Sequence, residues 1–122
     1  MGSTKPTILV AVGEPLAGDR LVRELGPDYH VLLARDGLDA AVQYERRATQ
    51  VSAVVADMRL PRLSGDLLAE WLHHIDPQLP VIIMTGDEAA EEVESLLKYP
   101  AVRLVRKPLA APRLKALLDA SI

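Results

Sequence analysis

Short continuous apolar runs alternate along the chain with segments in which apolar residues recur every three or four positions. The runs lie at residues 7–12, 29–34, 51–56, 81–84 and 102–105. Continuous apolar runs of this length are typical of strands buried on both faces of a parallel sheet, and the recurring spacing is typical of amphipathic helices. The pattern therefore predicts five strands, each followed by a helix.

The clearest helical segment is Gly65–Ile75, which we expect to begin after Ser64 as N-cap and to end before Pro77. Its apolar residues predict one buried face made of Leu67, Leu68, Trp71, Leu72 and Ile75. The other helices are marked by Leu21, Val22 and Leu25 before Gly26; by Leu38, Ala41 and Val42; by Ala89, Ala90, Val93, Leu96 and Leu97; and by Leu114, Leu117 and Leu118.

Five strand–helix pairs joined by right-handed crossovers give a five-stranded parallel sheet with helices on both faces. The 122 residues suffice for one domain, and no linker or internal repeat divides them. In such a sheet, ligands and chemistry lie at the carboxyl ends of the strands.

Composition narrows the class of protein. The apolar share of 49% and charged share of 25% are those of a soluble globular domain, and no apolar run approaches the ~20 residues of a membrane span. A net charge of −3 and an aromatic share of 3% argue against nucleic-acid binding. The chain has no cysteine, which excludes disulfides, zinc knuckles and thiol catalysis. We expect a cytoplasmic domain that binds neither membrane nor nucleic acid.

Three chemically useful side chains follow different predicted strands. Asp57 ends the third strand, Thr85 the fourth, and Lys107 follows the fifth. An acid, a hydroxyl and an ammonium therefore converge at one edge of the sheet.

The segments that carry these residues resemble the receiver domain of two-component response regulators. They are ILV at 8–10, ADMRLPRLSG at 56–65, PVIIMTG at 80–86 and RKP at 106–108. The resemblance implies a flavodoxin-like (βα)5 three-layer sandwich with strand order 2-1-3-4-5. It would occupy residues 7–122, with residues 1–6 as a leader or tag-like segment.

The resemblance also implies a phosphorelay function and no enzymatic one. Asp57 matches the phosphoacceptor, which takes its phosphoryl group from a histidine kinase or a histidine phosphotransfer protein. Lys107 matches the lysine that pairs with the carboxylate. Thr85 matches the hydroxyl that couples phosphorylation to a face formed by the fourth helix, fifth strand and fifth helix.

The family's Mg²⁺ site is altered in this sequence. Asp57 and the backbone carbonyl of Arg59 match two of the family's ligands, but Val12 and Gly13 stand where the family has paired acids. Mg²⁺ binding is therefore expected to be weak or absent. Glu14, one position later, either supplies a metal ligand or begins the first helix beside Pro15; we favour the helix.

Several alternatives stay open. A second departure is Leu104, which replaces an aromatic residue common in receivers, so the chain could instead be a phosphorylation-independent pseudo-receiver that serves as an interaction domain. A phosphatase of the haloacid dehalogenase type is another alternative, but it needs an acid where Arg59 stands. A flavodoxin-like nucleotide-binding protein is a third, but the sequence has no glycine-rich phosphate loop.

Charged residues predict a second surface feature. Two groups of opposite charge either meet across a homodimer axis or are each solvated. The acidic group is Asp87, Glu88, Glu91, Glu92 and Glu94, and the basic group is Arg103, Arg106, Arg113 and Lys115. His73 and His74, adjacent on a helix, are expected at the surface, and Trp71 is expected in the core.

Overall fold

The computed structural model of the chain describes residues 5–88 and 90–122. Residues 1–4 of the expected leader and Ala89 of the expected fourth helix lie outside the described residues. The elements, in chain order, are β1 (Thr7–Ala11), α1 (Pro15–Leu25), β2 (His30–Ala34), α2 (Gly37–Arg47), β3 (Val51–Asp57), α3 (Gly65–Ile75), β4 (Val81–Thr85), α4 (Ala90–Glu94), β5 (Val102–Arg106) and α5 (Ala111–Ser121).

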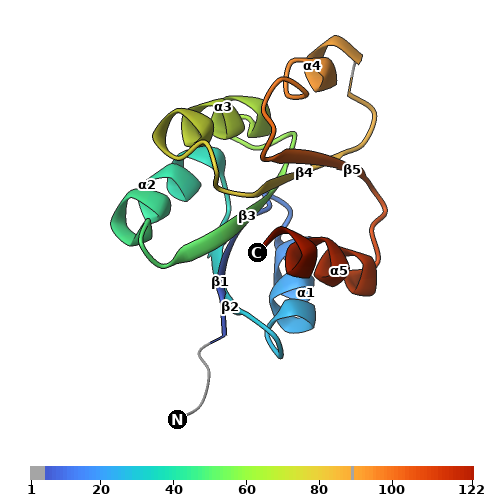
Figure 1. The fold of residues 1–122 in the computed structure, drawn as a ribbon. Helices are drawn as coiled ribbons and strands as arrows, with labels where there is room; N and C mark the ends of the chain where they lie inside the picture. The colour runs from blue at the N-terminus through green and yellow to red at the C-terminus, as the bar shows by residue number, and fades with distance from the viewer. Residues whose placement is uncertain (1–4, 89) are drawn as a thin grey trace.

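The five strands form one parallel sheet in the order β2-β1-β3-β4-β5, which confirms the expected fold (Figure 1). β3 is the middle strand, and its last four residues pair with β4 from Val54↔Val81 to Asp57↔Met84. The strand order reverses between β1 and β3, so the carboxyl ends of these two strands flank the place where a doubly wound sheet binds its ligands.

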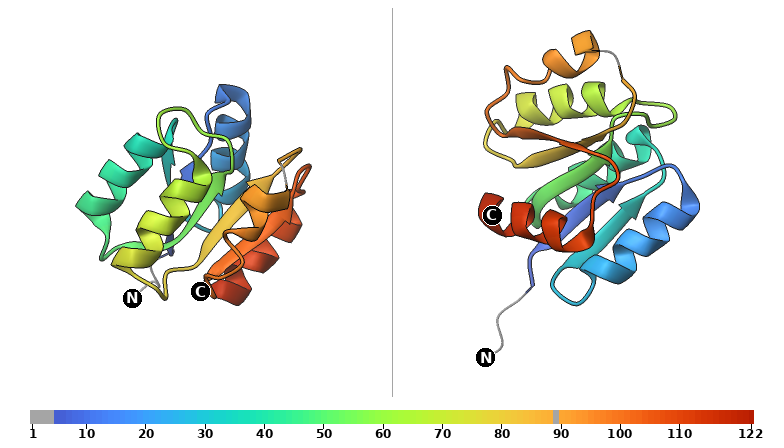
Figure 2. Two further views of the ribbon diagram at one scale, coloured as in Figure 1. Left: turned by 90° about the horizontal axis from the view of Figure 1, so that it is seen from above. Right: turned by 90° about the vertical axis from the view of Figure 1, so that its right-hand side faces the viewer.

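Alternate residues of each strand contribute to two separate cores. Ile8 and Val10 of β1 pack with Leu25, Leu114 and other residues of the α1–α5 face. Leu9 and Ala11 face the opposite core, which includes buried residues of α2 and α3 together with Leu96 and Tyr99. Figure 2 shows the resulting sandwich, with the sheet between two layers of helices. Because β1 and β3 are covered on both sides, they consist almost entirely of apolar residues.

The buried faces of α2 and α3 differ from the prediction. Leu38 and Val42 of α2 are 43% and 39% exposed, because the smaller Ala40 and the ring of Tyr44 occupy the buried face instead. In α3, Leu68, Ala69 and Leu72 are buried, whereas Leu67 and Ile75 are about half exposed.

Trp71 packs against the core, as expected, and its ring lies edge-on to Tyr44 with centroids 6.1 Å apart. The prediction for His73 was wrong. Its ring is stacked on Tyr99, with centroids 4.4 Å apart, and its Nδ1 atom is buried with no hydrogen-bond partner among the described residues. His74 is exposed, as expected.

The fourth helix is much shorter than its apolar pattern predicted. The helix ends at Glu94, with a last helical bond from Ser95 N–H to the Glu91 carbonyl. The chain continues in tight turns in which Leu96 N–H donates to the Val93 carbonyl and Tyr99 N–H donates to the Leu96 carbonyl. Bonds between residues three apart place Leu96 and Tyr99 on the same side, where both are buried. The tight turns thus bring Leu96 and Tyr99 into the core without a further turn of α-helix.

None of the helices in the described ranges has the length and apolarity needed to span a membrane.

Gly65 fixes how closely α3 approaches the end of β3. A Cβ atom at this position would lie 2.2 Å from the backbone oxygen of Asp57 and 2.8 Å from the Cα atom of Met58. Gly65 N–H also donates to the Met58 carbonyl over 2.8 Å. A glycine is required here because the helix begins directly against the backbone that carries Asp57.

We expect Gly65→Ala to lower the free energy of unfolding by roughly 1–3 kcal/mol, the usual cost of overpacking. Gly86→Ala is the matched control, because its added Cβ atom would meet nothing closer than Glu88 Oε2 at 3.6 Å. Urea denaturation of both variants measures the difference. Equal stability of the two variants would contradict the packing argument.

Candidate functional site

Asp57 is the last residue of β3 and lies at the carboxyl end of the middle strand. The three residues before it, Val54, Val55 and Ala56, are fully buried and hold the strand between the two cores. Asp57 as a whole residue is only 8% exposed, and 11% of its side chain is accessible to solvent. A carboxylate so poorly solvated requires compensation by a nearby charge.

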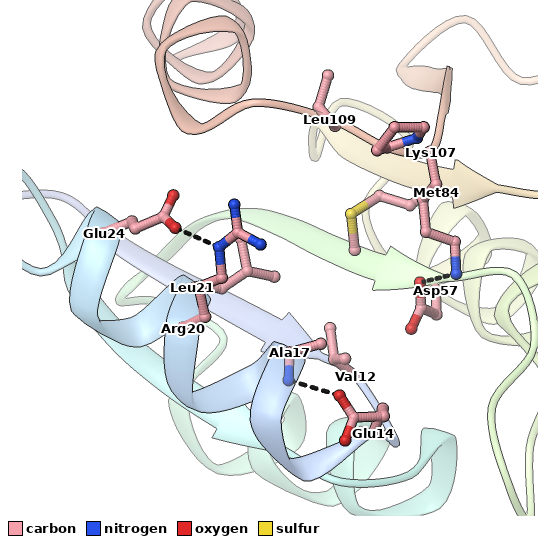
Figure 3. Close-up of a pocket in the computed structure, with 11 residues that line it drawn as sticks. Val12, Glu14, Ala17, Arg20, Leu21, Glu24, Asp57, Met84, Lys107 and Leu109 are labelled. Atoms are coloured by element: carbon pink, nitrogen blue, oxygen red, sulfur yellow. Dashed lines mark hydrogen bonds and ion pairs between the residues drawn. The ribbon is translucent and has the colours of Figure 1, made fainter.

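Lys107 supplies this compensation. It follows β5 directly, and its Nζ atom lies 3.0 Å from Asp57 Oδ1 (Figure 3). Its backbone N–H donates to the Thr85 carbonyl over 2.8 Å, which ties the residue to the end of β4. The lysine side chain remains about half exposed, so the ion pair can be reached from solvent. The structure therefore brings together the acid and the ammonium that the sequence singled out.

Thr85 is near this pair, but its hydroxyl has another partner. Thr85 Oγ1 donates to the Val105 carbonyl of β5 over 3.3 Å, a long bond. Among the described residues, the hydroxyl has no hydrogen bond to Asp57 or Lys107. Its backbone position at the end of β4 matches the expectation, whereas its side chain is directed to β5.

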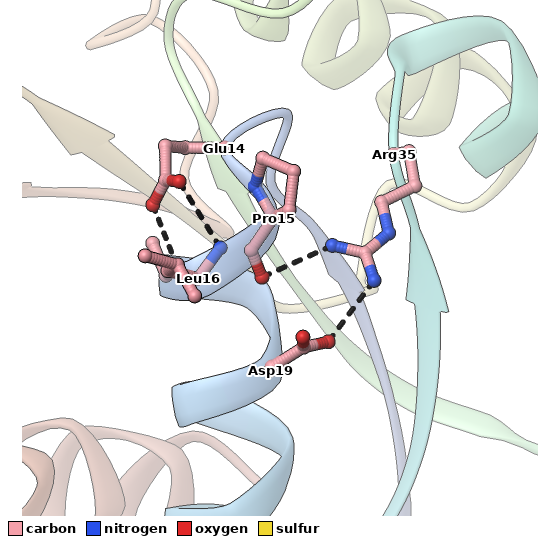
Figure 4. A network of polar contacts seen from close by, with 6 residues as sticks. Glu14, Pro15, Leu16, Asp19 and Arg35 are labelled. Carbon is pink, nitrogen blue, oxygen red and sulfur yellow. Dashed lines mark hydrogen bonds and ion pairs between the residues drawn. The ribbon is translucent and has the colours of Figure 1, made fainter.

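Glu14 caps the first helix. Its Oε1 atom accepts from Leu16 N–H over 3.1 Å and its Oε2 atom from Ala17 N–H over 2.7 Å, so both carboxylate oxygens satisfy free amides of the first turn (Figure 4). Arg35 holds the same turn by donating to the Pro15 carbonyl and to Asp19. The interpretation of Glu14 as the start of the helix is confirmed.

The residues present do not fit a magnesium site of the family's kind. Mg²⁺ requires near-octahedral oxygen ligands and commonly uses one or two carboxylates. Val12 is apolar and 1% exposed, Gly13 has no side chain, and Glu14 is engaged in capping. Within residues 5–88 and 90–122, no three acidic, histidine or cysteine residues gather where they could hold a metal. Asp57 is thus left without a second free carboxylate beside it.

Packing also opposes a side chain at position 13. A Cβ atom on Gly13 would lie 3.0 Å from Pro61 Cδ and 3.5 Å from the carbonyl oxygen of Arg35. An acid here would require Pro61 to shift, whereas position 12 already carries a branched side chain. The two missing acids are therefore not equally easy to replace.

A cavity of about 370 Å³ opens beside the Asp57–Lys107 pair, between α1 and the segment after β5 (Figure 3). Its lining is Val12, Glu14, Ala17, Arg20, Leu21, Glu24, Asp57, Met84, Lys107, Pro108 and Leu109. Sequence reasoning missed Arg20 and Glu24, which form an ion pair of 2.6 Å on α1. Their i, i+4 spacing indicated only a solvated helix face.

Glu88 is a second residue that sequence reasoning missed at this edge of the sheet. Its side chain is only 5% exposed, its Oε1 atom accepts from Gly86 N–H over 2.9 Å, and its Oε2 atom lies 3.5 Å from Arg59 Nε. Glu88 therefore connects the loop after β4 with the loop after β3. The expectation that Glu88 belongs with the acidic residues of the fourth helix is wrong, because its side chain is turned toward Gly86 and Arg59.

Comparison with known proteins agrees with this arrangement. Residues 8–119 match the family model of the response regulator receiver domain. The transcriptional regulatory protein ZraR of Salmonella typhimurium is 29% identical over 97 residues, which are 80% of this chain but 22% of that protein. The sensor histidine kinase RcsC of Salmonella typhi is 29% identical over 112 residues, 91% of this chain and 12% of that one. The chain thus spans about a fifth or less of the length of these relatives.

A solved structure gives the same result. The response regulator receiver domain protein from Clostridium thermocellum superposes with a TM-score of 0.90 at 26% identity, over 96% of this chain and 94% of that one. A match to the family model over nearly the whole chain, together with the fold and the positions of Asp57 and Lys107, shows that this chain belongs to the receiver domains of response regulators.

Proposed function

We propose that the chain is a phosphorelay signalling module that accepts a phosphoryl group on Asp57. Phosphoryl acceptance is general to the family, and the observation that supports it here is the Lys107–Asp57 pair at the mouth of an open cavity. In the reaction, an Asp57 oxygen forms a bond to phosphorus while the bond between phosphorus and a histidine nitrogen of the donor breaks. The product is an acyl phosphate.

Lys107 is proposed to stabilise the charge of the transferring group. Phosphoryl transfer depends on positioning and charge neutralisation more than on covalent help. The ammonium already lies 3.0 Å from Asp57 Oδ1, and its exposure leaves room for it to contact an incoming phosphoryl oxygen. With Val12 and Gly13 in place of the acid pair, Lys107 carries more of this task than it does in a receiver with both acids.

Thr85 is proposed to pass the change on to the α4–β5–α5 face. Its hydroxyl now donates to Val105 over 3.3 Å, and turning toward a phosphoryl oxygen would release that bond to β5. Leu104, half buried on the same strand, would adjust without the ring movement of an aromatic residue. The proposed donor is a histidine kinase or a histidine phosphotransfer protein, which places the module in the cytoplasm.

The pseudo-receiver remains the second candidate. It is favoured by the apolar Val12 at the floor of the site and by the capping role of Glu14, which leave Asp57 without the usual metal environment. In that case the chain would act as an interaction domain, with the Lys107–Asp57 pair serving only to stabilise the fold. The phosphorylation experiment below separates the two functions.

Incubation with acetyl phosphate or phosphoramidate is expected to add one phosphoryl group, detected by intact mass. Asp57→Asn should abolish the adduct, and Asp87→Asn, which changes an exposed aspartate near the same sheet edge, should retain it. Lys107→Gln should slow the reaction by roughly a hundredfold, the usual effect of removing one preorganised charge. An adduct that persists in Asp57→Asn would contradict the assignment, and no adduct on the unmodified chain would favour the pseudo-receiver.

Mg²⁺ is expected to bind the unmodified chain at least about tenfold more weakly than it binds Val12→Asp, since ~1.4 kcal/mol of ligation makes that difference. Position 12 is preferred to position 13 because Pro61 crowds a side chain there. Calorimetry is the suitable measurement, since Trp71 is not among the residues that line the cavity. Glu14→Gln serves as control and should leave the weak affinity unchanged. A loss of Mg²⁺ binding in Glu14→Gln would show that Glu14 is a ligand after all.

A homodimer through α4, β5 and α5 is the proposed assembly. Glu91, Glu92 and Glu94 are exposed, as are Arg103, Arg106 and Arg113, so opposite charges are available on this face. Lys115 does not belong to it as expected, because its Nζ atom lies 2.9 Å from Asp28 in the loop between α1 and β2.

Sedimentation at low and high ionic strength tests the dimer, which should weaken as salt screens the exposed charges. Arg103→Glu is expected to shift the chain toward monomer at low salt, and Lys115→Glu, outside the face, is expected to leave the assembly unchanged. A chain that stays monomeric at low salt and high protein concentration would exclude the dimer.

A further inference from the structure

The cavity beside Asp57 is larger and more apolar than a phosphoryl site requires. Its volume of about 370 Å³ lies in the range of pockets that hold small organic molecules. Apolar side chains form much of the wall: Val12, Ala17, Leu21, Met84 and Leu109. Figure 3 shows that they come from the end of β1, from α1, from β4 and from the segment after β5, and that they surround the same space.

The charges that line the cavity are already balanced against one another. Lys107 is paired with Asp57 at 3.0 Å, and Arg20 with Glu24 at 2.6 Å. Both oxygens of Glu14 accept hydrogen bonds from the first turn of α1. An anion that is not transferred to Asp57 would have to compete with Asp57 for Lys107 and with Glu24 for Arg20. A cationic ligand would meet Lys107 and Arg20. The lining therefore favours an uncharged molecule.

An acceptor atom of Asp57 remains available to orient such a molecule. Asp57 Oδ1 is engaged by Lys107, and Oδ2 accepts no hydrogen bond from the residues that the structure describes. A ligand hydroxyl or N–H group could donate to Oδ2. Met84 also lines the cavity, and a thioether sulfur makes favourable contacts with aromatic rings. A few convergent polar atoms within an apolar pocket are the usual design of a small-molecule site.

We propose that this cavity binds an uncharged aromatic molecule whose body lies between α1 and the segment after β5. A hydroxyl or N–H group of the ligand donates to Asp57 Oδ2. Val12 is central to this site, because a carboxylate at position 12 would replace its apolar floor with charge. Binding itself does not depend on the phosphoryl transfer proposed above. If Asp57 is the phosphoacceptor, the same molecule blocks it, and its concentration controls phosphorylation.

The neutral fluorophore N-phenyl-1-naphthylamine, which has one N–H donor, is a suitable probe. Titration of the intact chain should give a saturable rise in fluorescence with one site per molecule. Leu21→Gln and Leu109→Gln, on opposite walls of the cavity, should each weaken binding about tenfold or more, because a buried apolar contact is lost. Leu67→Gln is the matched control, since Leu67 is about half exposed on α3 and does not line the cavity. Urea denaturation checks that each variant is folded.

Equal affinity for the probe in the unmodified chain and both cavity variants would overturn the proposal. A loss of affinity in Leu67→Gln as large as that in the cavity variants would also overturn it, because it indicates nonspecific adsorption. Asp57→Ala should also weaken binding, and Asp87→Ala should not; unchanged affinity in Asp57→Ala would overturn the orientation. Acetyl phosphate labelling of the same samples keeps the two proposals separate. If the chain binds the probe but is never phosphorylated, the ligand site stands and the proposed phosphorelay function is overturned. If the chain is phosphorylated but does not bind the probe, the phosphorelay function stands and the ligand site is overturned.

Discussion

The ion pair between Lys107 and Asp57 determines how the carboxyl edge of the sheet is organised. Asp57 is carried into a nearly buried position because β3 is the middle strand and is covered on both faces. A carboxylate there is costly unless a cation lies beside it, and removing one partner of a fully buried pair costs about 3–5 kcal/mol. Since Lys107 is about half exposed, solvent reduces that figure here. The segment after β5 is thus held against β3 by charge.

The departure from the usual acid pair extends into the packing of the loop after β1. Val12 belongs to the core on the α1–α5 face, Gly13 lies against Pro61, and Glu14 caps α1. Arg35 holds the first turn of the same helix by two hydrogen bonds. Each residue of this loop therefore has a structural role that excludes, or makes costly, the carboxylates found in other receivers. The altered site and the apolar cavity have the same cause.

Much of the fold could be predicted from the sequence, because strands buried on both faces leave uninterrupted apolar runs and α3 has clear boundaries at Ser64 and Pro77. The positions of Asp57, Thr85 and Lys107 at strand ends followed from those runs and from the resemblance. The apolar pattern failed where several faces competed for burial, as at Leu38 of α2, which Tyr44 displaces from the core. Glu88 could not be found from the pattern, since its burial depends on Arg59, which is 29 positions away in the chain.

The location of the site is consistent with the proposed coupling of Asp57 to the α4–β5–α5 face. Thr85 and Lys107 are joined by a backbone hydrogen bond of 2.8 Å, and the Thr85 hydroxyl reaches Val105, so the ends of β4 and β5 are linked twice. β5 is an edge strand that pairs only with β4 in the described sheet. A shift of β5 therefore disturbs one ladder of hydrogen bonds, whereas a shift of β1, β3 or β4 would disturb two. Together with the two links between β4 and β5, this supports the proposed route from Asp57 through β5 to the α4–β5–α5 face.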